Sequence, residues 1–540
     1  MTKLLDRRVV VLLVILLGLA LAVAGRMLLR PAGETAYAPG GSLALAATLD
    51  DMLDRPRVYE LPGVAVFAPA VDDADAELVS LGNMLCDAIT ERLVETRRLR
   101  LVSCNSTRAA AQSNLDGAYL AHLLGVDFAV DGELTREPNG PPQLRMQMRE
   151  LRGAARVWSL EDEPTSERVG NVVARVSDRV LAGAGVAAVV DVTPIAPLVY
   201  GKYLRATQLA RGSNAQQLEA LGLIREVVEQ APDYSPALYT LLALRSMTAS
   251  VARPGEPPAT AEELARRNAE RLQDTRLLGE RLVTVNPDDW RGHTLLMNDA
   301  FEHRRWQAAV QHAERLAQGP SARPGGARIH AQLQLYAGYA IRARLQARLA
   351  AVADPLDAQA YRLLAQAHGI AGDNEGMRNF ASIAEEITGH GVPLFEALLA
   401  RRAGDDAAFV EHFSQWLETY YGDAAAARTV AEGVVDRGQR DAALAAIAAL
   451  PQAARMRTAE HLMEYALLEL PERSAESVLA AADRGPAGWL GHLWWPELAD
   501  MRAQPAFAQA MVLTGVTQLW DQEGAPDSCT LASGGGWHCR

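Results

Sequence analysis

The chain begins with a long apolar segment and then changes pattern twice. Val9–Leu29 (VVVLLVILLGLALAVAGRMLL) has 21 residues, and only Arg26 interrupts its apolar run. At about 1.5 Å per residue, a helix of this length measures roughly 31 Å, which is close to the hydrocarbon thickness of a bilayer. The pattern predicts a membrane-spanning helix over Val9–Leu29.

The residues that flank this segment bear on its orientation. Lys3, Arg7 and Arg8 precede it, so we expect residues 1–8 in the cytoplasm and the bulk of the chain in the periplasm. The alternative is a secretory signal peptide cleaved after Ala22-Val23-Ala24, but apolar residues continue through Met27-Leu28-Leu29 and favour an anchor. Both interpretations export the rest of the chain.

After a linker at 30–60, rich in Gly, Ala and Pro, the pattern alternates between short apolar strands and amphipathic helices. We expect strands at Val64–Ala70, Leu99–Cys104, Val126–Glu137 and Gln143–Leu160, and helices at Leu78–Val94, Arg108–Leu124 and Glu167–Val190. The order β-α-β-α-β-β-α predicts a small sheet covered by helices, and therefore an α/β domain over 61–195.

From 196 to 500 the chain changes again and is predicted to form helix after helix. Pro287 and Pro355 lie 68 residues apart, twice the 34-residue period of tetratricopeptide repeats. Small residues fall where paired helices of such repeats touch, at Ala220, Ala343 and Ala350. We therefore expect degenerate tetratricopeptide-like repeats, with an insertion in the unit before Pro287. The predicted fold class is a membrane-anchored α+β protein that ends in an all-α solenoid.

Composition and motifs narrow the range of functions. The 540 residues carry a formal net charge of −13, which argues against nucleic acid as a partner. The chain contains no HExxH, no GxxxxGK[ST] and no GxSxG. We therefore expect no catalytic residues, no cofactor, no metal and no enzymatic activity. The sequence gives no indication of the oligomeric state.

Four cysteines are candidates for disulfides, as expected of an exported protein. Cys529 and Cys539 enclose nine residues with three consecutive glycines in a tail at 501–540, and we predict that they are bonded. Cys86 and Cys104 lie on neighbouring predicted elements, so they form either a second disulfide or two buried thiols.

Several motifs of the α/β domain resemble a known family. In order, they are Val64–Pro69, Leu81–Leu85 followed by Leu99–Val102, Leu123–Leu134, and Val157-Trp158-Ser159. This series resembles the amino-terminal domain of TolB and FlgO-type domains. The resemblance implies kinship with the exported halves of bacterial membrane-anchored transcription regulators and adenylate cyclases, which also carry tetratricopeptide repeats.

The end of the chain resembles the end of the same family. The matching positions are Met501–Phe507, Gly515, Leu519-Trp520 and Gly524–Cys529. Relatives carry a winged-helix or cyclase domain before the membrane helix, whereas only Met1–Arg8 precede it here. We therefore expect a tether without an output domain in the same chain.

Two functions are compatible with these observations. The first is a membrane-tethered periplasmic interaction or scaffold module, whose tetratricopeptide groove binds a protein or peptide partner in the cell envelope. Its groove candidates, which could equally be core residues, are Tyr203, Tyr239, Tyr336 and Tyr361. The alternative is the sensory part of a split transcription-regulator or adenylate-cyclase system. An enzyme that acts on envelope polymers would be a third class, but no motif supports it.

Overall fold

The computed structural model of the protein describes thirteen stretches of the chain. They are residues 60–71, 75–111, 117–137, 140–151, 155–165, 168–187, 195–210, 212–248, 261–318, 325–450, 461–485, 488–533 and 535–540. Within these stretches, no helix combines the length and the apolar character needed to cross a bilayer. The predicted span Val9–Leu29 and residues 30–59 lie outside the described residues.

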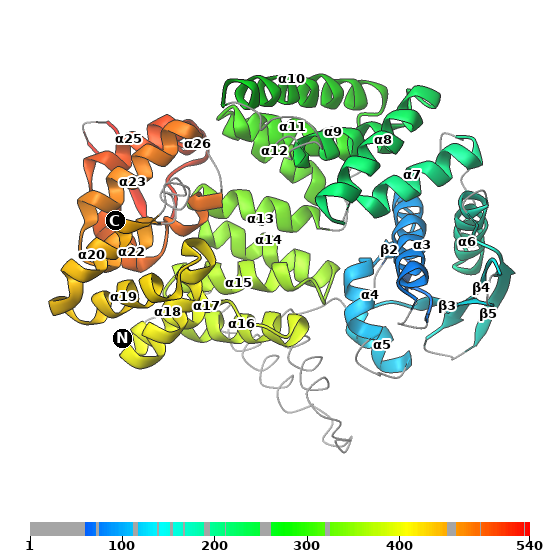
Figure 1. The fold of residues 1–540 in the computed structure, drawn as a ribbon, viewed down its shortest axis with the longest axis horizontal. Helices are drawn as coiled ribbons and strands as arrows, with labels where there is room; N and C mark the ends of the chain where they lie inside the picture. Colours follow the sequence, from blue (N-terminus) through cyan, green and yellow to red (C-terminus); the bar gives the residue numbers. More distant parts are fainter. Residues whose placement is uncertain are drawn as a thin grey trace, which may run out of the picture. The chain divides into compact units, whose positions relative to one another are not determined.

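The first described region is a small sheet with helices (Figure 1). Its strands are β1 (Gly63–Val66), β2 (Arg100–Leu101), β3 (Phe128–Arg136), β4 (Pro142–Glu150) and β5 (Arg156–Asp162), in the sheet order β2-β1-β3-β4-β5. Its helices are α3 (Ala76–Glu95), α4 (Cys104–Ala111), α5 (Gly117–Leu124) and α6 (Val169–Gly183). β1 pairs in parallel with β2 and β3, whereas β3, β4 and β5 are antiparallel.

Apolar and polar side chains alternate along the strands of this domain, and the apolar ones form its core. Leu144, Met146 and Met148 of β4 are buried, and the residues between them are polar. Because successive side chains of a strand point to opposite faces, one face of the sheet is apolar. α3 and α6 cover that face, with Leu85 and Val176 both fully buried.

The sheet domain departs from the predicted elements in one of the expected strands. The stretch Gln143–Leu160, expected as one strand, forms the two strands β4 and β5, so the sheet has five strands. An unbroken strand of 18 residues would extend roughly 60 Å, far more than a small sheet can pair. The expected helix Arg108–Leu124 corresponds to the end of α4 and to α5, and residues 112–116 lie outside the described residues.

A helical repeat-like region follows the sheet domain. Its helices are α7 (Pro197–Leu209), α8 (Asn214–Gln230), α9 (Ser235–Met247), α10 (Ala261–Val285), α11 (Trp290–Glu302), α12 (Trp306–Ala317), α13 (Gly326–Tyr336), α14 (Ala340–Ala353), α15 (Ala358–Ile370), α16 (Asn374–Thr388), α17 (Pro393–Ala403), α18 (Asp406–Tyr421), α19 (Ala424–Val435) and α20 (Arg440–Ala449). A short 3₁₀ turn, η2 (Arg437–Gln439), precedes α20.

Consecutive helices pair from α11 onward. The first helices of the pairs begin at Trp290, Gly326, Ala358, Pro393 and Ala424, at intervals of 36, 32, 35 and 31 residues. We refer to α11, α13, α15 and α17 as the A helices, and to α12, α14 and α16 as the B helices. Ala220, Ala343 and Ala350 are all buried, as their predicted place between paired helices requires. The extra length before Pro287 includes the 25-residue helix α10.

The C-terminal elements fold back onto the repeats. They are α22 (His461–Leu467), α23 (Pro471–Arg484), η3 (Gly488–His492), η4 (Pro496–Leu498), α24 (Ala499–Arg502), α25 (Pro505–Thr514), α26 (Val516–Glu523), β6 (Cys529–Leu531) and β7 (Trp537–Cys539). Trp520 of α26 donates from Nε1 to the carbonyl of Ala337, 2.9 Å away. Trp306 of α12 donates from Nε1 to the carbonyl of Thr514 at 2.7 Å. The end of the chain is therefore part of the core.

Candidate functional site

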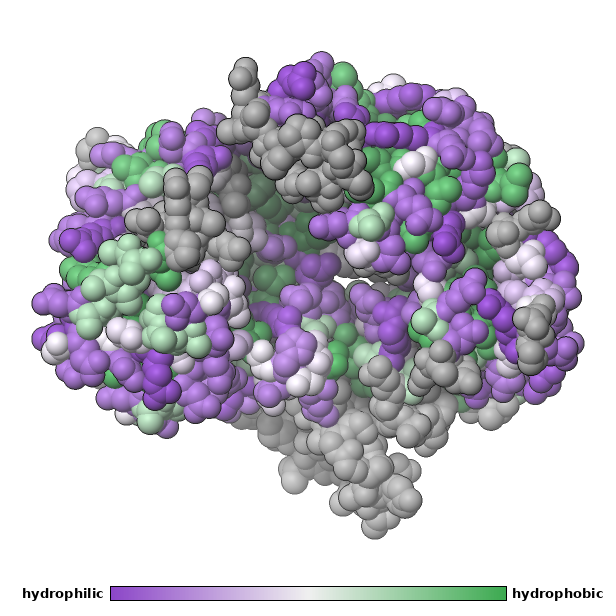
Figure 2. Space-filling view, in the orientation of Figure 1, coloured by the Kyte–Doolittle hydropathy of each residue, from purple (hydrophilic) through white to green (hydrophobic). Residues whose placement is uncertain are grey.

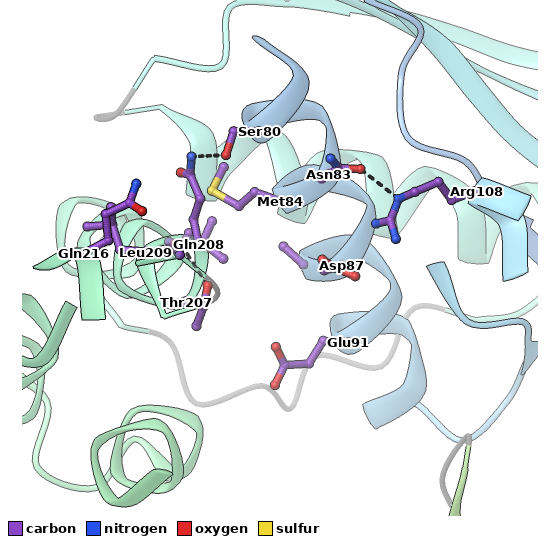
Figure 3. A pocket seen from close by; sticks show the side chains of 13 residues that line it. Ser80, Asn83, Met84, Asp87, Glu91, Arg108, Thr207, Gln208, Leu209 and Gln216 are labelled. Atoms are coloured by element: carbon purple, nitrogen blue, oxygen red, sulfur yellow. Dashed lines mark hydrogen bonds between the residues drawn. The ribbon is translucent and has the colours of Figure 1, made fainter. Parts of the chain in front are cut away.

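A polar cleft lies between the sheet domain and the first helix of the repeat-like region (Figure 3). Its volume is about 600 Å³, within the range of small-molecule and peptide sites. Helix α3 forms one wall and α7 the other, with contributions from α4 and the start of α8. The lining residues are Ser80, Asn83, Met84, Asp87, Ala88, Glu91, Arg108, Leu204, Thr207, Gln208, Leu209, Gly212 and Gln216.

The amphipathic pattern of α3 creates the polar wall. The side chain of Asp75 caps the helix by accepting hydrogen bonds from the backbone N–H groups of Glu77 and Leu78. Leu85 and Ile89 face the sheet and are fully buried. Positions three to four residues apart share a helix face, so Ser80, Asn83, Asp87 and Glu91 come together on the side that faces α7.

Hydrogen bonds hold several of the lining side chains in place. Oδ1 of Asn83 accepts from Nε of Arg108 at 3.1 Å, and Arg108 also donates to Asn105 at 2.9 Å. Across the cleft, Nε2 of Gln208 donates to Oγ of Ser80 (Figure 3). The cleft therefore presents ordered hydroxyl, amide and carboxylate groups with partners from separate elements.

An ionic cluster closes one end of the cleft. The guanidinium of Arg291, on α11, donates to Oε1 of Glu91 and to Oε1 of Glu95, each at 2.7 Å. Tyr203 of α7 donates to Oε2 of Glu91 at 3.3 Å, and Asp289 lies 3.7 Å from Arg291. The side chain of Arg291, which joins α3 to the repeats, is only 5% exposed, so the guanidinium is largely shielded from solvent.

Burial and the neighbouring charges shift the pKa values of Glu95 and Arg291 in opposite directions. Burial raises the pKa of Glu95, and the neighbouring Arg291 only partly lowers it. For Arg291, burial alone would lower the pKa, but the carboxylates of Glu91, Glu95 and Asp289 together raise it above its ordinary value. Arg291 therefore stays charged, and removing it would leave two carboxylates facing each other in a buried site.

The four tyrosines predicted to line a groove differ in burial. Tyr203 and Tyr361 are buried, so both are core residues, the other role considered for them. Tyr203 packs edge-on against Tyr234, with ring centroids 5.3 Å apart, and Tyr361 donates to the carbonyl of Pro355 at 2.8 Å. Tyr239 and Tyr336 are half-buried, and the four rings do not form one surface.

C-terminal residues cover part of the A helices, where the predicted groove would lie. Trp495 packs edge-on against Phe395 of α17, with centroids 5.9 Å apart, and Gln366 of α15 donates to the carbonyl of Gly491 at 2.8 Å. Arg402 of α17 binds Glu497 through two nitrogen–oxygen contacts of 2.6 and 3.0 Å. These contacts close the groove across α15 and α17 with residues of the same chain.

Hydrophilic side chains predominate on the face drawn in Figure 2. Figure 2 shows this face hollowed over the middle of the repeat-like region, beside the C-terminal elements. Neither the cleft nor the ionic cluster was predicted, because Arg291 lies 200 and 196 residues from its partners in sequence and no local motif connects them. The tryptophans after Gly485 were the one visible sign that the end of the chain is buried.

Both candidate disulfides are present. Cys86 on α3 is bonded to Cys104 at the start of α4, and Cys529 is bonded to Cys539 across the hairpin β6–β7. Within the described stretches, no group of three or more His, Cys, Asp or Glu side chains could hold a metal ion. His312 of α12 faces His293 of α11, with their Nδ1 atoms 3.0 Å apart.

No family model matches the chain, and no curated protein matches it.

Proposed function

We propose that the protein is a binding module of the bacterial cell envelope, tethered to the inner membrane through Val9–Leu29 with its bulk in the periplasm. The two disulfides support this location, because such bonds persist in oxidising compartments. In this proposal the sheet domain is TolB-like or FlgO-like, and the helical region is a set of degenerate tetratricopeptide repeats.

The polar cleft between α3 and α7 carries the proposal. Hydroxyl and amide side chains at Ser80, Asn83, Thr207 and Gln208 supply the donors and acceptors that a peptide backbone needs. Asp87 adds a carboxylate that favours a Lys or Arg side chain. The ligand that fits best is an extended peptide segment of a partner protein with a basic residue.

The binding site proposed here differs from the groove expected of the repeats. Trp494 and Trp495 are at most 1% exposed, so displacing them from the A helices would return two large apolar side chains to water. The cleft requires no such displacement. A partner therefore binds at the joint between the sheet domain and the repeats.

The position of the cleft also favours a second function, the sensory part of a split signalling system. A ligand held between α3 and α7 contacts both the sheet domain and the repeats, next to the ion pairs of Arg291 that join them. Its binding would change how firmly the two are held together. This function requires a regulator or cyclase among the captured partners.

Affinity capture from envelope fractions tests the binding function. Asp87→Arg reverses a charge in the cleft, Thr207→Trp fills it from the other wall, and Asp441→Arg makes the same charge change on exposed α20. Thermal unfolding first establishes that the variants fold. We expect a partner recovered with the wild type and Asp441→Arg, and lost with both cleft variants. Equal recovery by all of them, or by none, contradicts the proposal.

A further inference from the structure

A second pocket lies among the C-terminal elements and shares no residue with the cleft between α3 and α7. Its volume is about 690 Å³, which is enough for a small molecule. Helices α23, α25 and α26 and strand β7 form its walls, and α23 and α25 lie side by side (Figure 1). The proposed function makes no use of this pocket.

The most buried residues of the pocket are apolar. Phe507 and Met511 of α25 and Trp520 of α26 line it, and each is 1% exposed. Leu479 of α23 also lines the pocket and is half-buried. A ligand that enters exchanges water for aliphatic and aromatic side chains, which favours an apolar group in this part of the pocket.

The pocket is open to solvent, and its mouth is partly apolar as well. Val512 and Leu513 line it and are 64% and 36% exposed. The sequence of α25, PAFAQAMVLT, contains no charged residue. A Cβ at Gly536, which also lines the pocket, would meet no atom within 4 Å, so the hairpin does not close the mouth there.

A carboxylate and an indole ring stand together in this pocket. Among the lining residues that the structure describes, Asp521 of α26 is the only one with a charged side chain, and it is exposed. Its Oδ1 accepts a hydrogen bond from Nε1 of Trp537, 3.0 Å away. Trp537 is half-buried and packs edge-on against Trp520, with ring centroids 5.7 Å apart. The pocket thus combines an apolar interior with one anionic group beside an aromatic ring.

The aromatic side of the pocket is held in place before any ligand binds. The disulfide between Cys529 and Cys539 closes the hairpin that carries Trp537. Trp520 is fixed by its hydrogen bond to the carbonyl of Ala337 at 2.9 Å. Binding therefore needs to order few side chains, which lowers its cost.

Charges of both signs surround the pocket, but Asp521 alone lines it. Arg540, which follows β7, donates to His538 at 3.1 Å, and Glu523 pairs with Arg342 of α14 at 3.2 Å. The charge that a ligand meets inside the pocket is therefore that of Asp521. The charged residues of the helical walls are Glu472, Arg473, Glu476, Asp483 and Arg484 on α23, and Asp521 and Glu523 on α26.

We propose that this pocket binds a small organic cation, an ammonium ion that carries an aryl or alkyl group. The apolar group occupies the space beside Phe507 and Met511, and the ammonium lies between the carboxylate of Asp521 and the ring of Trp537. Both the carboxylate and the aromatic ring attract a cation. A neutral apolar molecule gains nothing from the carboxylate, and an anion is repelled by it. This site is independent of the cleft between α3 and α7.

Three ligands of similar size and different charge test the proposal: phenylethylammonium, the neutral phenylethanol and the phenylacetate anion. Each is titrated into the full-length protein in detergent, and isothermal titration calorimetry gives the dissociation constants. Asp521→Asn removes the charge but keeps an acceptor for Trp537, and Leu479→Trp fills the pocket from α23. Glu523→Gln is the matched control, because it makes the same charge change on α26 outside the lining. Thermal unfolding first establishes that each variant folds.

We expect the cation to bind about ten-fold more tightly than the alcohol, and the anion not to bind. Asp521→Asn should weaken binding of the cation about five-fold and Leu479→Trp should abolish it, whereas Glu523→Gln should leave it unchanged.

Equal affinity for the cation and the alcohol overturns the proposal and indicates an apolar slot for a partner's side chain. So does a cation that fails to bind below about 10 mM, or one whose binding is lost with Thr207→Trp in the other cleft and kept with Leu479→Trp. Affinity capture of a protein partner uses none of these ligands, so this proposal and the proposed function can fail separately.

Discussion

Arg291 of α11 and Glu91 of α3 form a partly buried ion pair, 2.7 Å long, between the repeats and the sheet domain. Glu95 accepts a second hydrogen bond from the same guanidinium, also at 2.7 Å. Because α3 is one wall of the polar cleft and Glu91 lines it, this arginine helps to fix the position of that wall. The stability of the joint and the shape of the cleft therefore depend on the same residue.

Replacing Arg291 by methionine should strongly destabilise the protein. The Arg291→Met substitution removes the guanidinium that binds both Glu91 and Glu95 and leaves the two carboxylates facing each other. Breaking a fully buried pair costs about 3–5 kcal/mol, and because the two carboxylates are partly exposed we expect a cost of about 2–3 kcal/mol here. We expect the free energy of unfolding, measured by urea denaturation, to fall by that amount.

Arg97→Ala is the matched control for that experiment. Arg97 pairs with Asp288 at 3.0 Å, again between the sheet domain and the repeats, but both side chains are about two-fifths exposed. Exposed pairs contribute about 0–1 kcal/mol. If Arg291→Met and Arg97→Ala lower the free energy of unfolding equally, the cluster around Arg291 does not stabilise the joint more than an exposed ion pair does.

The contact between the C-terminal segment and α13 can be tested with two glycines. Gly338 and Gly372 both have positive φ, +88° and +77°, so alanine costs roughly 1 kcal/mol at either. A Cβ at Gly338 would also lie 2.8 Å from the ring of Trp494, whereas at Gly372 no atom lies within 4 Å. We expect Gly338→Ala to cost about 1–3 kcal/mol more than Gly372→Ala in thermal unfolding. Equal losses of stability would show that the ring of Trp494 does not pack against Gly338.

The sequence predicted those elements whose signal is local. The spacing of six apolar residues predicted the buried face of α3, and five of them are buried whereas Leu81 is half-buried; the six are Leu78, Leu81, Leu85, Ala88, Ile89 and Leu93. The division of Gln143–Leu160 was missed because both strands contain apolar and polar residues, and the sequence between Glu150 and Arg156 contains no Pro or Asn. Alternation of side chains indicates a strand but does not locate its end.

The candidate site could not be predicted, for a different reason. Each of its residues is ordinary for its helix: Glu91 is a polar residue on an amphipathic helix, and Arg291 follows the cap of α11. The site exists only because α3, α7 and α11 meet, and no pattern in a single sequence encodes contacts across 200 residues. The same limit applies to Trp495, whose partner Phe395 lies on α17.

Acidification should destabilise the protein through His492. Burial lowers the pKa of this histidine from 6.5 to about 4, beside the ring of Trp416. As the pH falls from about 6.5 to 4, the unfolded chain binds a proton at this site before the folded chain does. The contribution of His492 to stability is therefore present above about pH 6.5 and is lost through this window, by about 3 kcal/mol at about 1.4 kcal/mol per pKa unit. His492→Phe keeps the aromatic contact and should make the loss smaller; an unchanged pH dependence would contradict this.

The terminal disulfide should stabilise the hairpin that ends the chain. Cys529 and Cys539 are directly paired in the β6–β7 register, and Trp537 of the same hairpin packs against Trp520. Replacing both cysteines by serine releases a short loop, which should lower the free energy of unfolding by about 2–3 kcal/mol. Reduction of the wild type should give a similar change from this bond. A double variant as stable as the wild type would show that the hairpin needs no covalent closure.

Occupation of the cleft between α3 and α7 by a partner peptide can be measured most directly with a photo-activated cross-linking residue at Thr207 in intact cells, with Asp441 as the control position. We predict a light-dependent adduct with an envelope protein from Thr207, none from Asp441, and a weaker adduct when Asp87→Arg is also present. No adduct from Thr207, or the same adduct from both positions, would contradict this account of the cleft.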